Sequence, residues 1–567
     1  MLPPLSARFR RFTPQKMTVQ ASHPLPASQP NVASAREPAS RSQMAHASRE
    51  RLAWIGLGIL GVMSVAVFWA FDALPFQDLP AHAGLIEMRH RFAQSPFEQR
   101  FYVLAPHIGP YSLFRFFGEV FVRIMGPVNA VRAIATLPVI ATPLALMFGR
   151  FKLHGDRSAT TGFLGLSLSF GLMTLLGFAS YTLGVAVMLV GLTLWLDLMI
   201  TVDAHERSLK KELVLTAYAP LIFVAHGHAF VLFLILAGIA AIACGDRLRR
   251  MLRLVVLVPA LSLAAYVAWI ERGSSVPVGS VADPQANFTP RFQGAYDKLS
   301  LLVTPTLITR TGIDIAIGAV LWGLLGAAIV MTARDRLILG DSSPQSIRSE
   351  NARKHAKALL AGALVLAAIF FALPHAIGWF GFVDGRLVPI FLFLCVLSYR
   401  RASLGSLAHA IDRAAPVLAF GMASLALLAS YRFQAEARGY KETLAQIPAE
   451  TRILNLPLDP NSSIFTAHPF IHYDKLVLAD RPVVVSDVWF HQGSAIYPTS
   501  ENPAMHLPAS YSESNLLYID WPAYRLNEWD FALIRTRPNA PRPPTPNSLE
   551  LASHIGGWWL FRIKHEA

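Results

Sequence analysis

Cysteine is almost absent from this chain of 567 residues. The two cysteines, Cys244 and Cys395, lie within or at the end of apolar runs, so they form no disulfide framework. Charged residues are scarce as well, at 15% of the chain against 53% hydrophobic residues, and the mean hydropathy is +0.41. That composition excludes an ordinary soluble globular protein. The sequence therefore predicts a polytopic membrane protein.

Acidic residues are also few, 36 against 50 basic residues, which leaves a formal charge of +14. An excess of positive charge can indicate nucleic-acid binding. Here the basic residues lie in short loops beside apolar runs, where retention of Lys and Arg on the cytoplasmic side accounts for them. We therefore expect membrane lipid, and no nucleic acid, among the partners.

The apolar runs predict how the chain crosses the bilayer. Residues 52–71 carry no charge over about 20 residues, the length that a helix needs to span a hydrocarbon core. The polar stretch of about 50 residues before them is too long for a cleaved signal peptide, so we expect an uncleaved anchor. Residues 213–244, about 32 in number, exceed one span and carry His226-Gly227-His228 in their middle, which predicts two short helices that meet there. We predict eleven spans in all, at residues 52–71, 130–148, 159–178, 181–200, two within 213–244, 252–270, 313–333, 358–376, 387–399 and 414–431.

One apolar segment, residues 110–125, fits the membrane surface better than a span. Arg115, Glu119 and Arg123 recur in it at four-residue spacing and form one charged stripe on a helix. Such a helix lies in the interface plane. If this segment crossed the bilayer, every later basic loop would move to the wrong face.

The two ends of the chain differ in composition from its middle. Residues 1–50 are rich in Ser, Pro, Ala and Arg, which predicts a disordered cytoplasmic tail. An acid-poor, Arg-rich start is also typical of an organellar transit peptide, and Met44 offers a later start. Residues 434–567 contain short β-like runs between turn residues, at 452–456, 482–485, 531–534 and 558–561.

The predicted fold class is therefore an α-helical polytopic membrane protein with a small extracytoplasmic α/β domain. Residues 1–50 form the tail, residues 51–433 form the transmembrane domain with a first outer loop at 72–129, and residues 434–567 form the α/β domain. We expect the inner membrane of a bacterium, with the N-terminus in the cytoplasm and the C-terminus in the periplasm.

Aspartate and histidine residues lie in loops predicted for the face opposite the basic loops. The first outer loop contains Asp72, Asp78 and His82. An acid at the membrane surface is partly desolvated, which raises its affinity for protons and suits a general base, and Asp78 is the first candidate. The alternative is a helix cap or turn residue, because Asp before Leu-Pro is common in turns.

The order of these features resembles the GT-C superfamily of polyprenyl-phosphate-sugar glycosyltransferases. The resemblance rests on the acid soon after the first span, the surface helix beginning near Pro110-Tyr111, and the approach Gly126 … Ala130 … Arg132 to the second span. It implies that Asp78 is the catalytic base, with His82 and Asp72 as further catalytic candidates in the same loop. Leu79 follows Asp78 where many members of the superfamily have a second acid, which weakens a metal-binding reading of this motif.

The resemblance also implies a polyprenyl-phosphate-linked sugar as donor, whose phosphate cations must hold. The candidates on the outer face are Arg386, Lys298, Arg310 and Arg89, although snorkelling or topology also explains each of them. Arg386 is the strongest, because it opens a short span of about 13 residues that is expected to be recessed.

Further pocket candidates lie at the outer ends of later spans, namely His226, His228, His375 and Asp384. Their separation in sequence gives no metal-ligand spacing, so no metal site is predicted, and a divalent cation stays open as a cofactor. A transporter or flippase is the main alternative function, yet charges within the spans are nearly absent. The sequence specifies neither the sugar and acceptor nor the oligomeric state.

Overall fold

The computed structural model describes residues 41–104, 108–201, 208–243, 252–273, 289–303, 306, 308–338, 347–378, 380–487, 496–514 and 516–565. The chain divides into two units, Met1–Arg49 and Glu50–Ala567, and the architecture below is that of the second. Of the predicted N-terminal tail, residues 1–40 lie outside the described residues. Its last ten residues are helical and belong to the first helix.

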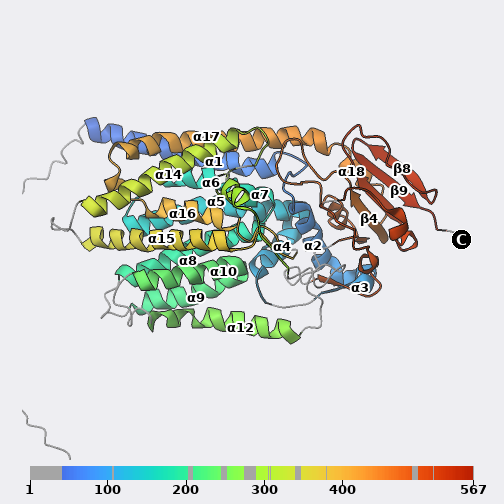
Figure 1. Cartoon of the computed structure of the whole chain (residues 1–567), viewed down its shortest axis with the longest axis horizontal. Coiled ribbons are helices and arrows are strands. Elements are labelled where there is room, and N and C mark those ends of the chain that lie inside the picture. The colour runs from blue at the N-terminus through green and yellow to red at the C-terminus, as the bar shows by residue number, and fades with distance from the viewer. Residues whose placement is uncertain are drawn as a thin grey trace, which may run out of the picture. The chain divides into compact units, whose positions relative to one another are not determined.

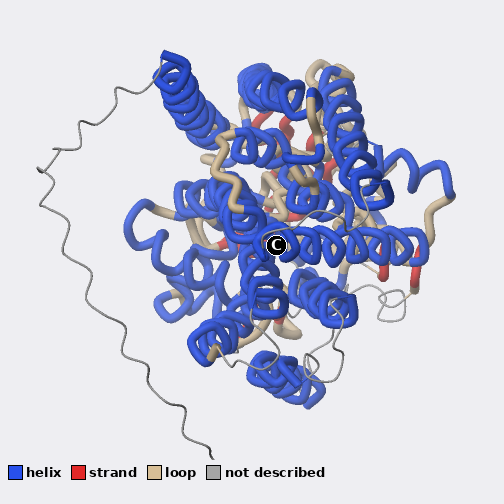
Figure 2. The backbone as a smooth tube through the Cα atoms, turned by 90° about the vertical axis from the view of Figure 1, so that its left-hand side faces the viewer, coloured by secondary structure: helices blue, strands red, loops and turns tan. Residues whose placement is uncertain are grey.

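The middle of the chain folds into long apolar helices that run side by side (Figure 1), and Figure 2 views many of them end on. These helices are α1 (Arg41–Trp69), α5 (Pro127–His154), α8 (Ala179–Thr201), α9 (Leu209–Ala225), α10 (Gly227–Ala243), α12 (Val258–Gly273), α14 (Ile313–Ile338), α15 (Ile347–Ala372), α16 (Leu387–Ser398) and α17 (Ser406–Ala437).

Seven helices within the described residues are long and apolar enough to cross a membrane, and α10 and α16 are shorter apolar helices. The multi-pass character of the chain is therefore confirmed, whereas the predicted count of eleven spans is not. One reason lies in residues 159–178, which are divided into α6 (Thr160–Ser169) and α7 (Leu172–Leu175). The backbone is extended at Phe170 and Gly171, so this run is not one continuous helix.

The prediction for residues 213–244 is confirmed. The helices α9 and α10 have 17 residues each and meet at His226, whose backbone is extended. The segment predicted to lie on the membrane surface forms α4 (Ser112–Met125). With 14 residues it is about 21 Å long, which is too short to span a bilayer. It buries Phe114, Gly118 and Val122, one stripe at four-residue spacing.

The C-terminal part contains a five-stranded mixed sheet, which lies beyond one end of the helices (Figure 1). Its strands are β4 (Thr451–Pro457), β5 (Val483–Val485), β7 (Phe531–Arg535), β8 (Leu549–Ile555) and β9 (Trp558–Ile563), in the order β5-β4-β7-β9-β8. The strand β4 is parallel to β5 and β7, and β9 is antiparallel to β7 and β8. The four predicted strands correspond to β4, β5, β7 and β9. The edge strand β8 was not predicted, since most of its side chains are exposed and it lacks an apolar run.

The remaining described elements are short and lie in the connections. The α-helices are α2 (Leu79–Arg91), α3 (Pro96–Phe101), α13 (Ala295–Val303), α18 (Tyr440–Leu444) and α19 (Lys475–Leu478). The strands are β1 (Tyr102–Leu104), β2 (Pro290–Arg291), β3 (Ala376–Ile377) and β6 (Ile496–Pro498). The 3₁₀ helices are η1 (Phe92–Gln94), η2 (Arg253–Leu257), η4 (Arg401–Ser403), η5 (Pro503–His506), η6 (Trp521–Ala523) and η7 (Leu526–Glu528).

Several contacts attach the C-terminal part to the first loop, and two of them join elements of secondary structure. The strand β1 pairs antiparallel with β6, so that Tyr102 lies opposite Pro498. The helix α19 packs against α2 at Gly84, where an added Cβ would lie 2.5 Å from the carbonyl oxygen of Lys475. A side chain at position 84 would therefore separate the two helices. We call the end of the helices that faces these contacts the sheet end.

The opposite end collects basic side chains, as the sequence predicted. Arg150, near the end of α5, donates to the carbonyl of Tyr399 and lies 2.7 Å from Asp156. Arg253 donates to the carbonyl of Leu198 at 2.8 Å. The predicted basic cluster at 246–250 lies outside the described residues.

Candidate active site

Asp78 is fixed where the first loop turns into α2. It occupies the N-cap position of that helix, yet its side chain makes no capping hydrogen bond, so the carboxylate is left for other partners. Its backbone N–H donates to the carbonyl of Leu176 at 3.2 Å. Gly177 allows this approach, because a Cβ there would lie 2.7 Å from the Asp78 nitrogen and its φ of +77 lies in the left-handed region.

The Asp78 side chain lines a cavity of about 710 Å³ at the sheet end. The walls come from α2, α4, the region of α7, α8, the junction of α9 and α10, α13, the loop before α16, and residues 466–472 and 514 of the C-terminal part. Five residues predicted from the sequence line this cavity, namely Asp78, His82, Arg89, His226 and Arg386.

The surroundings of Asp78 make it a proton acceptor near neutral pH. The residue is 9% exposed, and burial raises the pKa of its carboxyl to about 7. A hydrogen bond from Gln77 Nε2 at 3.3 Å and the charge of Arg386 act in the opposite direction. His472 of the C-terminal part places its Nε2 3.6 Å from Asp78 Oδ1. A carboxyl group with this pKa suits general-base catalysis.

Arg386 is held in the cavity wall by aromatic rings. Its guanidinium carbon lies 3.9 Å from the ring centre of Phe380 and 4.7 Å from that of Phe178. The Tyr181 hydroxyl donates to the backbone carbonyl of Arg386, which fixes the chain at this point. The Nε atom is buried and has no hydrogen-bond partner among the described residues. A stacked guanidinium with an unused donor is suited to binding an anion such as phosphate.

A second arginine lines the cavity from α2. Arg89 has a buried Nη1 atom without a hydrogen-bond partner among the described residues. Glu119 of α4 also lines the cavity, but it is engaged by His90 at 3.2 Å and by Arg123 at 2.7 Å. The cavity therefore holds a second cation with a buried donor that no described residue engages.

The two predicted histidines that line the cavity are packed against aromatic rings. The ring centre of His82 lies 4.5 Å from that of Phe114. His226 lies between Tyr111 and Tyr181, with ring centres 5.0 and 5.3 Å away. Tyr111 has a φ of +71, a left-handed conformation that is costly for a tyrosine and brings its ring to His226.

Six predicted site residues do not line the cavity, and their roles in the reaction stay predictions. Asp72 pairs with Lys441 at 2.9 Å and borders a second cavity of about 390 Å³. Arg310 donates to the carbonyls of Ser462 and Phe465 at 3.0 and 3.1 Å. The backbone N–H of His228 donates to His226 Nδ1 at 3.2 Å.

The other three of these residues form one group, in which Lys298 and Asp384 are buried and His375 is partly exposed. Lys298 donates to the carbonyls of Phe370 and Leu373 at 2.8 and 2.6 Å, and lies 3.3 Å from Asp384. His375 Nδ1 lies 2.9 Å from Asp384. An ammonium group has three donors, and these contacts engage them. The group ties the end of α15 to the loop before α16.

Sequence reasoning missed the contribution of the C-terminal part to the cavity. His468, His472 and Ser514 of that part line it, as does Gln77 of the first loop. His468 and Gln77 are joined by a hydrogen bond across 391 positions of sequence, and no local pattern predicts such a contact. The one available signal was the polar run His472 to Lys475 beside an apolar segment. Within the described residues, no three His, Cys, Asp or Glu side chains are arranged to hold a metal ion.

No protein-family model matches the chain, and no curated protein matches it. Among solved structures it is similar to the arabinofuranosyltransferase AftD from Mycobacteria, with a TM-score of 0.47 and 13% identity over 90% of this chain and 40% of that one. It is also similar to the oligosaccharyltransferase AglB from Archaeoglobus fulgidus, with a TM-score of 0.45 and 13% identity over 86% of this chain and 70% of that one. The likeness to both proteins is one of fold alone, and this chain spans 40% of the length of the first of them.

Proposed function

We propose that this chain is an integral membrane glycosyltransferase. It moves a sugar from a polyprenyl-phosphate donor to a hydroxyl group of a cell-envelope glycan, lipid or protein. The observation that carries the proposal is the presence in one cavity of a buried carboxyl group, Asp78, whose pKa is about 7, and a buried guanidinium, Arg386, with an unused donor. Transfer from a lipid phosphate needs a base of this kind and a cation of this kind.

In the proposed reaction, Arg386 and Arg89 bind the phosphate of the donor. The apolar part of the cavity wall, which includes Leu172, Leu176 and Phe178, accepts the first units of the prenyl chain. The acceptor hydroxyl lies beside Asp78, which removes its proton as the oxygen attacks the anomeric carbon. The bond between that carbon and the phosphate oxygen breaks, and the electron pair leaves with the lipid phosphate.

The proposal places the reaction on the outer face of a bacterial inner membrane. Basic side chains gather at the end of the helices opposite the cavity, and basic loops are retained in the cytoplasm. The sheet end, with the cavity, would then face the periplasm. A lipid-linked donor can reach the cavity there without leaving the bilayer.

The test uses a deletion strain that expresses either the wild-type chain or a single variant. Lipid-linked sugars and surface glycans are measured by mass spectrometry, which identifies both substrates. The variant Asp78→Asn should insert normally and abolish the transfer, so that the donor accumulates. Asp520→Asn, at an exposed carboxylate of the C-terminal part, serves as the matched control and should restore the glycan. An unchanged glycan profile in Asp78→Asn would refute the proposal.

A further inference from the structure

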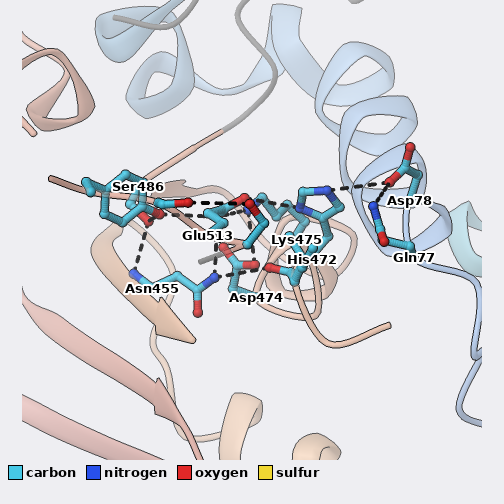
Figure 3. A network of polar contacts seen from close by, with 12 residues as sticks. Gln77, Asp78, Asn455, His472, Asp474, Lys475, Ser486 and Glu513 are labelled. Atoms are coloured by element: carbon cyan, nitrogen blue, oxygen red, sulfur yellow. Dashed lines mark hydrogen bonds and ion pairs between the residues drawn. The ribbon is translucent and has the colours of Figure 1, made fainter. Parts of the chain in front are cut away.

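Asp78, the proposed base in the cavity, is connected to a chain of buried polar groups in the C-terminal part (Figure 3). His472 is 5% exposed and stands between two carboxylates. Its Nε2 lies 3.6 Å from Asp78 Oδ1, and its Nδ1 lies 3.2 Å from Glu513 Oε2. The imidazole therefore has one nitrogen toward Asp78 and the other toward Glu513, which does not line the cavity.

Glu513 is itself held by several buried groups. Lys475 forms an ion pair with it, and the Tyr511 hydroxyl donates to it at 3.3 Å. Asn455 Nδ2 donates to the same carboxylate at 3.4 Å. Lys475 also lies 3.2 Å from Asp474. Burying so many charged groups is costly, and apolar residues of similar volume often stabilise a fold as well or better. A buried ionic cluster beside a cavity is therefore a candidate for a functional role.

The position of His472 relative to Asp78 is fixed on both sides of the histidine. The Tyr473 hydroxyl donates to the carbonyl of Leu74 at 2.9 Å. The backbone N–H of His468 donates to Gln77 Oε1 at 3.3 Å. Both acceptors lie in the loop that carries Asp78, so the imidazole and the carboxylate are held in one frame. The distance of 3.6 Å is longer than a hydrogen bond, and catalytic contacts of this kind commonly shorten when substrate binds.

We infer that His472 receives the proton that Asp78 removes from the acceptor, and that Glu513 orients the imidazole for this step. The inference rests on the proposed function and assigns the C-terminal part a share in the reaction. Asp78 first takes the hydroxyl proton and becomes a carboxylic acid. It then passes this proton to Nε2 of the neutral imidazole and returns to a carboxylate. The imidazolium is stabilised by Glu513 through Nδ1–H and releases its proton to water when the products leave.

The charges around His472 agree with this role. Burial lowers the pKa of the imidazole, so it is neutral at rest and readily gives up to water a proton that it has accepted. Asp78, Glu513 and Asp487 favour the imidazolium once it forms, and Lys475 opposes it. His472 is a positioning and proton-accepting residue, since it contacts Asp78 and is not placed against the sugar.

The first experiment measures proton occupancy of Asp78 without any substrate. Dicyclohexylcarbodiimide reacts with protonated buried carboxyl groups, and mass spectrometry of the peptide reports labelling of Asp78 against pH in the full chain reconstituted in lipid. If His472 Nε2 takes up part of the proton of Asp78, His472→Gln should move the midpoint of labelling upward, because the carboxyl group then keeps its proton to a higher pH. Glu513→Gln should move it in the same direction, because it removes the charge that stabilises the imidazolium.

The matched control is a second histidine–glutamate pair outside the cavity. His506 Nδ1 lies 2.8 Å from Glu528 on the surface of the C-terminal part, and His506→Gln should leave the midpoint where it is. Thermal unfolding of each variant shows whether it is folded, and Glu513→Gln carries the test if His472→Gln is not. An unshifted midpoint in folded His472→Gln, or in folded Glu513→Gln, would overturn the inference.

The second experiment separates the inference from the proposed function. In the deletion strain, His472→Gln should lower the rate of glycan formation about 100-fold while binding of the lipid donor is retained. If Asp78→Asn abolishes transfer and His472→Gln leaves the rate unchanged, the proposed function stands and the inference fails. If the labelling midpoint shifts and Asp78→Asn still makes glycan, the proton contact is real and the proposed function fails.

Discussion

At the scale of single residues, burial of Asp78 sets its chemistry and lowers the stability of the fold. The pKa of its carboxyl is about 7 when folded, against 3.8 as a reference. Because the pKa is higher in the folded chain than in the unfolded chain, the protonated form of Asp78 makes the fold more stable than the ionised form does. This difference in stability is complete below about pH 4 and is lost as the pH rises through 7. Above pH 7 this loss amounts to at most about 4 kcal/mol. The base is therefore active in the pH range where it destabilises the protein.

The raised pKa of Asp78 gives a prediction for both activity and stability. The rate of sugar transfer should rise with pH through about 7, because only the ionised Asp78 accepts a proton. Asp78→Asn should raise the apparent Tm relative to the wild-type chain at pH 8 and change it little at pH 5. Differential scanning fluorimetry of both proteins at the two pH values measures this. Equal gains in Tm at pH 8 and pH 5 would show that ionisation of Asp78 does not destabilise the fold.

Arg386 gives a second prediction at this scale. Arg386→Ala should weaken binding of a synthetic farnesyl-phosphate sugar about 10- to 100-fold, because a charge-assisted hydrogen bond to phosphate is lost. Arg386→Lys keeps the charge, yet it loses the planar group stacked 3.9 Å from the Phe380 ring and should recover only part of the affinity. Arg525→Ala, at an exposed arginine, is the control. Microscale thermophoresis measures the binding. If Arg386→Ala binds as tightly as the wild-type chain, Arg386 does not belong to the phosphate site.

At the scale of elements, the contact between α2 and α19 holds the two halves of the candidate site together. Gly84 permits this contact, because a Cβ would meet the Lys475 carbonyl at 2.5 Å and the Leu478 Cβ at 2.9 Å. Gly84→Ala should destabilise the protein by about 1–3 kcal/mol and reduce transfer, since the helices must separate and carry Asp78 away from His472. Gly238→Ala in α10, where nothing lies within 4 Å of an added Cβ, should be neutral or stabilising. Thermal unfolding and glycan analysis of the pair test this, and equal behaviour of the two variants would contradict it.

The elements also show what sequence patterns could and could not predict. The meeting of two short helices at His226 followed from the length of one apolar run, and the short amphipathic α4 followed from charges at four-residue spacing. Both are local properties. The break at Phe170 was missed because an apolar run looks the same whether it is continuous or interrupted. The placement of His472 at Asp78 depends on contacts between distant segments, such as the bond from Tyr473 to Leu74, which no periodicity encodes.

At the scale of the whole molecule, the length of the helices keeps two groups of polar side chains at opposite ends. Arg150 and Arg253 lie at one end, and Asp78, His226 and Arg386 lie at the other. In a bilayer the first group would face the cytoplasm, since basic loops are retained there. The cavity and the five-stranded sheet would then share the periplasmic face. The inferred proton transfer requires this arrangement, because His472 of the C-terminal part must lie beside Asp78 at the membrane boundary.

Reporter fusions test this arrangement directly. Alkaline phosphatase, which is active only in the periplasm, should be active when fused after Ala437 at the end of α17 and inactive when fused after Arg400 between α16 and α17. Green fluorescent protein exported through the same route does not fluoresce in the periplasm, so it should give the opposite result at both sites. The two fusion points flank one long helix, so any single crossing of the bilayer there gives opposite results. Activity of the phosphatase after Arg400 alone would reverse the orientation, place Asp78 in the cytoplasm and exclude a periplasmic glycosyltransferase.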